Sequence, residues 1–188
     1  MVEKRKKEVS SLPLNGFILS GIFAAVTAIC SWINIPLPFT IVPINLALLG
    51  VHLSGSLLGC RYGLYAQLIY MLLGAIGVPV FAGFTGGFAV IAGPTGGFIL
   101  GYILCAAVVG YIGERTTSAI HLVFAMLLGL FLCYGFGLIW FMIVNHASLW
   151  TGLISCVIPF LPGDAIKISA AVILTTRLRP IIKTTRTF

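Results

Sequence analysis

The chain has 188 residues, of which 60% are hydrophobic and only 8% are charged. Soluble domains carry about 25% charged residues, so this composition excludes a soluble globular domain and indicates an integral membrane protein. The formal net charge is +7, but the basic residues gather at the chain ends and in short turns between apolar stretches. Membrane topology and attraction to anionic lipid explain where these basic residues lie, and no nucleic-acid-binding motif accompanies them.

The chain begins with a basic arm, residues 1–13, which is followed by a long apolar run. This run is longer than the apolar core of a signal peptide, about 7–15 residues, so we expect an uncleaved first span. Apolar segments of about 20 residues are long enough to cross a bilayer. They predict spans at 14–33, 43–59, 62–78, 96–113, 121–144 and 150–176, with Pro- and Gly-rich or polar reversals at 36–38, 83–97 and 145–148.

The positions of the basic residues favour six spans. All but one of the eleven lie in the N-terminal arm, at Arg61, at Arg115 or in a basic tail, residues 177–188. With six spans these four segments share one face, which the positive-inside rule makes cytoplasmic. Five or seven spans would separate the two basic termini. We therefore expect an all-α integral membrane protein, with a compact bundle of six transmembrane helices at 14–176 and both termini cytoplasmic.

The first predicted span carries small residues at four-residue spacing. Gly21 is followed by Ala25, and Ala24 by Ala28. Such a face lets another helix approach closely in lipid. Ordinary packing within the bundle explains the same pattern, so the residues alone leave both interpretations open.

Asp164 and Lys167 are the only charged side chains predicted inside a span. A charge in hydrocarbon costs at least about 2.5–3.5 kcal/mol on insertion scales, so it normally has a partner or a task. Pro162 and Gly163 interrupt the helix just before them, which places Asp164 in the first turn of a half-helix and Lys167 on the same face. A broken helix with charges at mid-membrane is typical of a solute-binding site. The alternative is an ion pair that only fixes helix packing.

The glycine-rich segment 78–97 has too many apolar side chains for an ordinary exposed loop. It lacks the glycine spacings of nucleotide-binding loops. We expect it to fold over a pocket as a lid, with a re-entrant packing segment as the alternative.

No constellation for catalysis or metal binding is present in the sequence. Five cysteines and three histidines are scattered singly, and no Gly-x-Ser-x-Gly nucleophile or second intramembrane carboxylate occurs. We therefore expect neither an enzyme nor a metal or other cofactor. An ATP-binding motif is also lacking, so active transport would draw its energy from other subunits.

An ordered set of motifs covers nearly the whole chain: residues 35–40 (Ile-Pro-Leu-Pro-Phe-Thr), 42–44, 57–59, 72–83, 86–87, 93–97 and the Pro-Gly-Asp-x-x-Lys run at 162–167. Together they resemble the BioY family, the biotin-binding substrate-specific (S) subunits of energy-coupling factor (ECF) transporters. The resemblance implies a six-helix subunit of the bacterial cell membrane that takes up biotin from the non-cytoplasmic side. Its implied partners are a transmembrane coupling protein and two ATPase subunits.

The resemblance also implies roles for individual residues. It makes Asp164 and Lys167 contacts to biotin, which carries both a ureido ring and a carboxylate. The remaining implied ligand contacts are Thr85, Gly86, Gly87 and Asn45, and the implied coupling-protein surface is Gly21, Ala25 and Ala28.

Two positions depart from the family pattern. Phe84 and Thr85 stand in a glycine-rich loop that commonly has Asn or Ser between its glycine pairs, and Ala47 stands where a Gln is frequent, with Asn45 nearby as a substitute. An S subunit for another small vitamin, or a structural membrane protein, remains the alternative.

Overall fold

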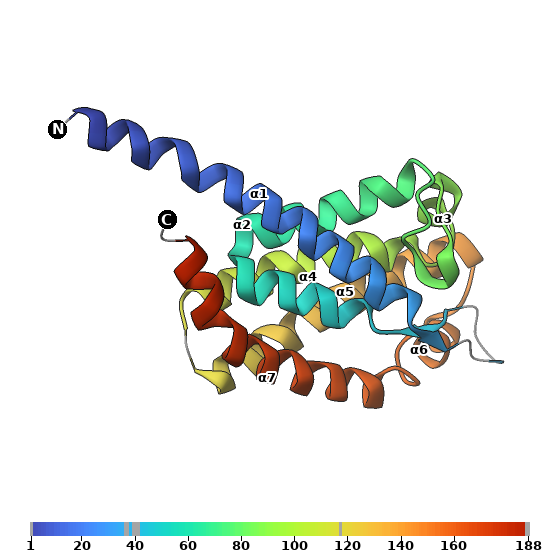
Figure 1. Cartoon of the computed structure of the whole chain (residues 1–188). Helices are drawn as coiled ribbons and strands as arrows, with labels where there is room; N and C mark the ends of the chain where they lie inside the picture. Colours follow the sequence, from blue (N-terminus) through green and yellow to red (C-terminus); the bar gives the residue numbers. More distant parts are fainter. Residues whose placement is uncertain (1, 36–37, 39–41, 117, 187–188) are drawn as a thin grey trace.

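The computed structural model describes residues 2–35, 38, 42–116 and 118–186, and for 2–13 and 182–186 it describes only the backbone. The described part is mostly helical, and Figure 1 shows its helices packed side by side, with the start of α1 and the end of α7 at the same end. The elements are α1 (Val2–Trp32), β1 (Asn34–Ile35), β2 (Ile44–Asn45), α2 (Ala47–Ala75), η1 (Ala82–Phe84), α3 (Phe88–Ala92), α4 (Gly96–Glu114), α5 (Ala119–Asn145), α6 (Leu149–Cys156) and α7 (Leu161–Arg186).

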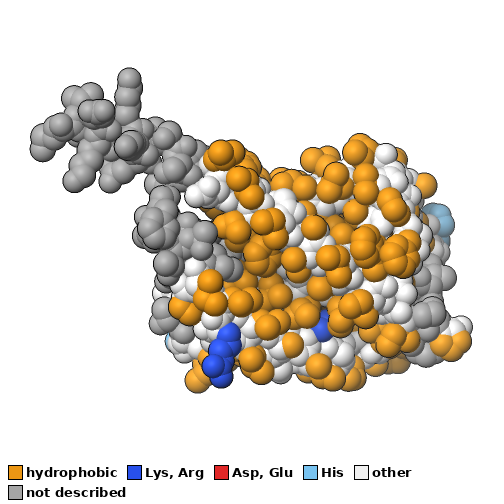
Figure 2. Space-filling model, in the orientation of Figure 1, with side chains coloured by type: hydrophobic (Ala, Val, Ile, Leu, Met, Phe, Trp, Pro, Cys, Tyr) orange, Lys and Arg blue, Asp and Glu red, His pale blue; other side chains and the backbone are white. Residues whose placement is uncertain are grey.

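Three helical stretches in the described chain are long and apolar enough to cross a membrane, namely Leu14–Trp32, Gly96–Glu114 and Ala119–Asn145. A fourth candidate is the pair Leu149–Cys156 and Leu161–Ile181, which meet at an angle of 50°. Large apolar side chains point outward, such as Phe124 and Phe131 of α5. Figure 2 shows that hydrophobic side chains also cover most of the opposite face, on which α1 lies. Lipid solvates such a surface, so these observations support a multi-pass membrane protein.

The second and third predicted spans form α2, which turns back on itself at Gly59 (φ 81°, ψ −178°). The amide Nε2 of Gln67 donates to Ser54 Oγ at 2.8 Å, whereas in an unbroken helix these two residues would be about 20 Å apart. The predicted reversal near residue 60 is therefore correct. Glu114 accepts the backbone N–H of Cys60 at 3.1 Å and so satisfies one donor where the second half begins. The six-span count and the cytoplasmic side of the termini stay predictions.

Small residues allow α2, α4 and α5 to pack closely. A Cβ on Gly110 of α4 would lie 2.4 Å from the Cys60 nitrogen, and one on Gly55 would lie 2.5 Å from the Ala106 carbonyl oxygen. Cys105 and Ala106 on the same helix are fully buried. This interface makes α4 the central helix of the bundle.

Three predicted span boundaries differ from the structure, and one of them is the end of the third span, which as helix ends at Ala75 rather than at 78. The span expected from residue 43 begins as helix only at Ala47, because residues 44–45 form β2, which pairs antiparallel with β1. The last span breaks at 157–160, before Pro162 rather than at it, and Asp164 lies in the first turn of α7 as predicted. Proline is tolerated in a first helical turn, where its missing N–H has no intrahelical acceptor. Of the reversal at 36–38, residues 36 and 37 lie outside the described residues.

Candidate functional site

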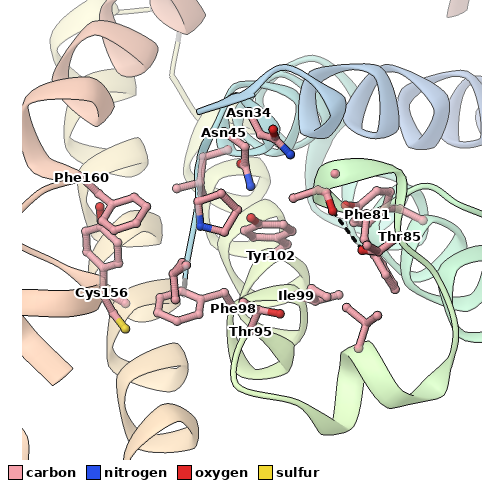
Figure 3. A pocket seen from close by; sticks show the side chains of 18 of the residues that line it. Asn34, Asn45, Phe81, Thr85, Thr95, Phe98, Ile99, Tyr102, Cys156 and Phe160 are labelled. Atoms are coloured by element: carbon pink, nitrogen blue, oxygen red, sulfur yellow. Dashed lines mark hydrogen bonds between the residues drawn. The ribbon is translucent and has the colours of Figure 1, made fainter. Parts of the chain in front are cut away.

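A cavity of about 540 Å³ lies at the end of the bundle where α6 and α3 are found. Figure 3 shows Phe81 and Thr85 on one side, Phe160 and Cys156 on the other, and Tyr102 between them. The cavity draws its wall from α2, α4, α5, α7, the β1–β2 pair and the glycine-rich segment. Its lining residues are Asn34, Val42, Pro43, Asn45, Leu48, Tyr70, Phe81, Ala82, Gly83, Thr85, Val90, Thr95, Phe98, Ile99, Tyr102, Tyr134, Cys156, Phe160 and Lys167.

The two intramembrane charges form a buried ion pair. Lys167 Nζ donates to Asp164 Oδ1 at 2.7 Å, and the two side chains are 5% and 2% exposed. The hydroxyl of Tyr134 on α5 donates to the other carboxylate oxygen, Oδ2. Lys167 lines the cavity, whereas Asp164 does not. Of the two paired charges, Lys167 is therefore the residue that reaches the cavity, and Asp164 is its counter-ion.

Aromatic rings form much of the rest of the wall. Tyr70 packs edge-on against Phe81 at 5.4 Å between ring centroids and lies 6.4 Å from Tyr102, while Phe98 packs edge-on against Tyr134 at 6.5 Å. Rings in such contacts hold one another in place. The cavity thus combines a rigid apolar body with a few polar groups, the usual composition of a small-molecule site.

The glycine-rich segment forms one side of this cavity. Phe81 and Thr85 pair in a short antiparallel bridge, and the Thr85 hydroxyl donates to the Ala82 carbonyl at 2.9 Å. Thr85 lines the cavity, but Gly86 and Gly87 do not. A Cβ on Gly86 would lie 2.5 Å from the Val78 carbonyl oxygen, so this glycine permits a close turn of the backbone.

Two tryptophans fasten the same segment to the bundle. Trp32 at the end of α1 donates its indole N–H to the Pro79 carbonyl at 2.8 Å, and Trp140 of α5 donates to Gly93 at 2.9 Å. Trp32 also stacks on Phe84 with ring centroids 5.0 Å apart. The segment is therefore held against the cavity, which fits both the predicted lid and a re-entrant packing segment, and the lid stays a prediction.

The predicted small-residue face of α1 divides between two environments. A Cβ on Gly21 would meet no atom within 4 Å, and Ala25 is exposed. Ala28 is only 5% exposed and packs inside the bundle. Gly21 and Ala25 are thus the open part of the predicted docking surface, and the docking role stays a prediction.

Asn45, which the resemblance makes a ligand contact, lines the cavity. The sequence interpretation missed Tyr134, Asn34 and the aromatic wall. A signal for Tyr134 was available, because a hydroxyl near the middle of a span needs a hydrogen-bond partner in hydrocarbon. Asn34 stood next to a proline-rich reversal and gave no comparable signal. Binding roles for all these residues stay predictions.

Comparison with known proteins gives a consistent picture. The sequence profile of the BioY family matches residues 4–184 of this chain. The chain belongs to the BioY family. Biotin transporter BioY of Thermotoga maritima is 38% identical over 86% of this chain and 94% of its own length. Biotin transporter BioY of Rhizobium etli is 36% identical over 84% of this chain and 89% of its own.

The fold also matches a solved structure, the S-component for biotin from an ECF-type ABC transporter. The TM-score is 0.84 at 29% identity, covering 91% of this chain and 94% of the other. The BioY resemblance predicted from the sequence motifs is thus confirmed, and the chain has the fold of an S-component. The family is one of membrane transport proteins, which agrees with the expectation that the chain is not an enzyme.

Proposed function

We propose that this chain binds biotin in the cavity described above and serves as the S-component of an ECF-type transporter. The observation that carries the proposal is the buried Tyr134–Asp164–Lys167 cluster at an otherwise aromatic cavity. Two apolar residues would pack the same space without desolvating two charges. The relatives named as biotin transporters supply the identity of the ligand.

In this proposal biotin enters from the non-cytoplasmic side of a bacterial cell membrane. The cavity lies at the end of the bundle opposite the chain termini, which the distribution of basic residues assigns to the cytoplasm. A coupling protein and two ATPases supply the energy, and the open small residues Gly21 and Ala25 on α1 offer the coupling protein a docking surface.

Direct titration tests the binding step. Protein reconstituted in nanodiscs is titrated with biotin by calorimetry, and we expect saturable binding below about 1 μM. Lys167→Met alone leaves Asp164 buried without its cation, so the neutral double variant Asp164→Asn/Lys167→Met is measured beside it. Both should bind at least about tenfold more weakly, because the polar group presented to the ligand is gone.

The matched control is Arg177→Met, which removes an exposed basic side chain from the same helix. It should leave the affinity unchanged. If the neutral double variant binds biotin like the wild type, the pair serves packing alone. If wild-type protein binds another vitamin but not biotin at micromolar concentrations, the chain is an S-component of different specificity.

A further inference from the structure

The side of α7 that faces the bundle is polar at both ends. Among the residues of this helix whose side chains the structure describes, five are buried at spacings of three and four: Asp164, Lys167, Ile168, Ala171 and Thr175. Only Ile168 and Ala171 of these are apolar. The large apolar side chains Ile166 and Ile173 point outward and are 72% and 61% exposed. α7 therefore presents few apolar side chains to the bundle.

Lipid leaves the register of such a helix, meaning its axial position and its rotation, undetermined. Lipid tails solvate apolar side chains as well as a neighbouring helix does, so outward apolar residues stay solvated when the helix slides or turns. Asp164 and Lys167 both belong to α7, so their ion pair also survives such a movement. Polar contacts with α2, α4 and α5 therefore have to fix the register of α7.

Two side chains of α7 make these contacts at the inner end of the bundle. The hydroxyl of Thr175 is hydrogen-bonded to that of Ser56 on α2 at 2.7 Å, and both residues are buried. One turn further along α7, Arg179 donates to three backbone carbonyls. Its Nη1 donates to Thr116 at 2.7 Å, and its Nη2 donates to Gly113 at 2.5 Å and to Ser56 at 3.3 Å.

The carbonyls that Arg179 binds lie at helix ends. In an unbroken helix the Cys60 N–H would donate to the Ser56 carbonyl, but at the break of α2 it donates to Glu114 instead. Gly113 lies in the last turn of α4, where the carbonyls have no donor within the helix. The negative ends of two helix dipoles thus meet at one guanidinium, whose planar fork of donors can serve several acceptors at once.

This contact is distant from the cavity but rigidly connected to it. Thr175 lies about 12 Å and Arg179 about 18 Å along α7 from Lys167, at about 1.5 Å per residue. A slip of α7 by one residue would move Lys167 by about 1.5 Å and turn it by about 100° around the helix axis. It would also separate Asp164 from Tyr134, which belongs to α5. Fixing register is the best-attested role of buried polar groups that add little stability.

We propose that Arg179 is a positioning residue, which together with Thr175 sets the register of α7 and so holds Lys167 at the cavity. Arg179 itself does not line the cavity. The effect on ligand binding rests on biotin being the ligand, as proposed above. Affinity at the outer end of the bundle then depends on an arginine at the inner end that never touches the ligand.

Binding measurements test the positioning role. In nanodiscs, Arg179→Met should weaken biotin by at least about tenfold, mainly through faster dissociation. Arg179→Lys should recover part of the loss, because an ammonium can still donate to the carbonyls. Arg177→Met, which removes an exposed basic side chain of the same helix, should leave affinity unchanged. Thr175→Val, which removes the hydrogen bond but keeps the shape, should weaken binding less and replaces Arg179→Met if that variant fails to fold.

The neutral variant Asp164→Asn/Lys167→Met separates positioning from general destabilisation. In that background Arg179→Met should weaken biotin by less than about threefold further, because Lys167 is no longer there to be positioned. An equal loss in both backgrounds, or unchanged affinity in the single Arg179 and Thr175 variants, would overturn the positioning role.

A distance measurement tests the register without a ligand. Spin labels are attached at Ile166→Cys on α7 and Ile139→Cys on α5, two exposed positions, after the native cysteines have been replaced by alanine. The distribution of distances between the labels should shift or broaden in Arg179→Met and stay unchanged in Arg177→Met. An unchanged distribution in Arg179→Met would contradict the proposed register. Wild-type protein that keeps this dependence but binds no biotin would instead contradict the proposed function.

Discussion

At the scale of single residues, Asp164 depends on a partner from another helix. Lys167 lies one turn away on α7 and was foreseeable from the spacing, but Tyr134 reaches the carboxylate from α5. The sequence could predict the first contact because helical geometry fixes which residues share a face. It could not predict the second, because the rotation and depth of α5 against α7 depend on packing across the whole bundle.

Removing the Tyr134 hydroxyl tests its role. Tyr134→Phe keeps the ring contact with Phe98 but leaves Asp164 Oδ2 without its donor, which should lower stability by about 1–3 kcal/mol. Biotin affinity should fall as well, because Asp164 can then draw Lys167 out of position. Thermal unfolding in detergent and calorimetric titration measure the two effects. Tyr111→Phe, at a half-exposed site on α4, is the control, and equal behaviour of the two variants would contradict the assigned contact.

At the scale of secondary-structure elements, glycine positions decide how closely the helices approach. Gly110 meets the backbone of α2 at its turning point, whereas a Cβ on Gly135 of α5 would meet no atom within 4 Å. The α2 reversal was predicted correctly, because the charge of Arg61 interrupts two long uncharged stretches there. Sequence analysis placed the helix start too early, because residues 44–45 are apolar enough to extend a span but pair with β1.

The two glycines should respond oppositely to the same substitution. Gly110→Ala forces α2 and α4 apart, because its Cβ would lie 2.4 Å from a backbone nitrogen, and the unfolding temperature should fall. Gly135→Ala should leave that temperature unchanged or raise it, since alanine favours helix by up to about 1 kcal/mol over glycine. Thermal unfolding of both purified variants measures these two changes in unfolding temperature. A drop in Gly135→Ala as large as in Gly110→Ala would contradict the close-packing explanation, because no atom lies within 4 Å of the Cβ added at Gly135.

At the scale of the whole molecule, the basic residues other than Lys167 and the cavity occupy opposite ends of the bundle. The ends of α1 and α7 lie together, and the cavity lies near α3 and α6 (Figure 1). Arg179 of α7 donates to the carbonyls of Ser56, Gly113 and Thr116. This basic side chain therefore joins α7 to α2 and to the end of α4, at the end of the bundle where the termini lie. Composition predicted the membrane class and the positions of the basic residues predicted the orientation in the membrane, whereas the shape of the cavity emerged only from the packed helices.

Topology mapping tests this polarity. Reporter fusions after residue 188 and before residue 1 should both report the cytoplasm, because the two basic segments resist translocation. A cysteine introduced at Ala147, in the turn between α5 and α6, should react with a membrane-impermeant maleimide added outside cells. The labelling is measured in a variant whose native cysteines are replaced by alanine, so that the introduced cysteine alone can react. Termini on opposite sides would rule out an even number of spans.

The turn of α2 at Gly59 also bears on how the protein is made. Its two halves, residues 47–58 and 60–75, extend only about 18 Å and about 24 Å, less than the roughly 30 Å of a hydrocarbon core. Neither half is long enough to partition into lipid alone as it leaves the ribosome. The hairpin therefore has to enter the bilayer together with α1 or α4, whose own spans are complete. A chain released after residue 80 should leave α2 open to protease and a chain released after residue 116 should protect it if α4 is the partner, whereas protection in both chains would assign that part to α1.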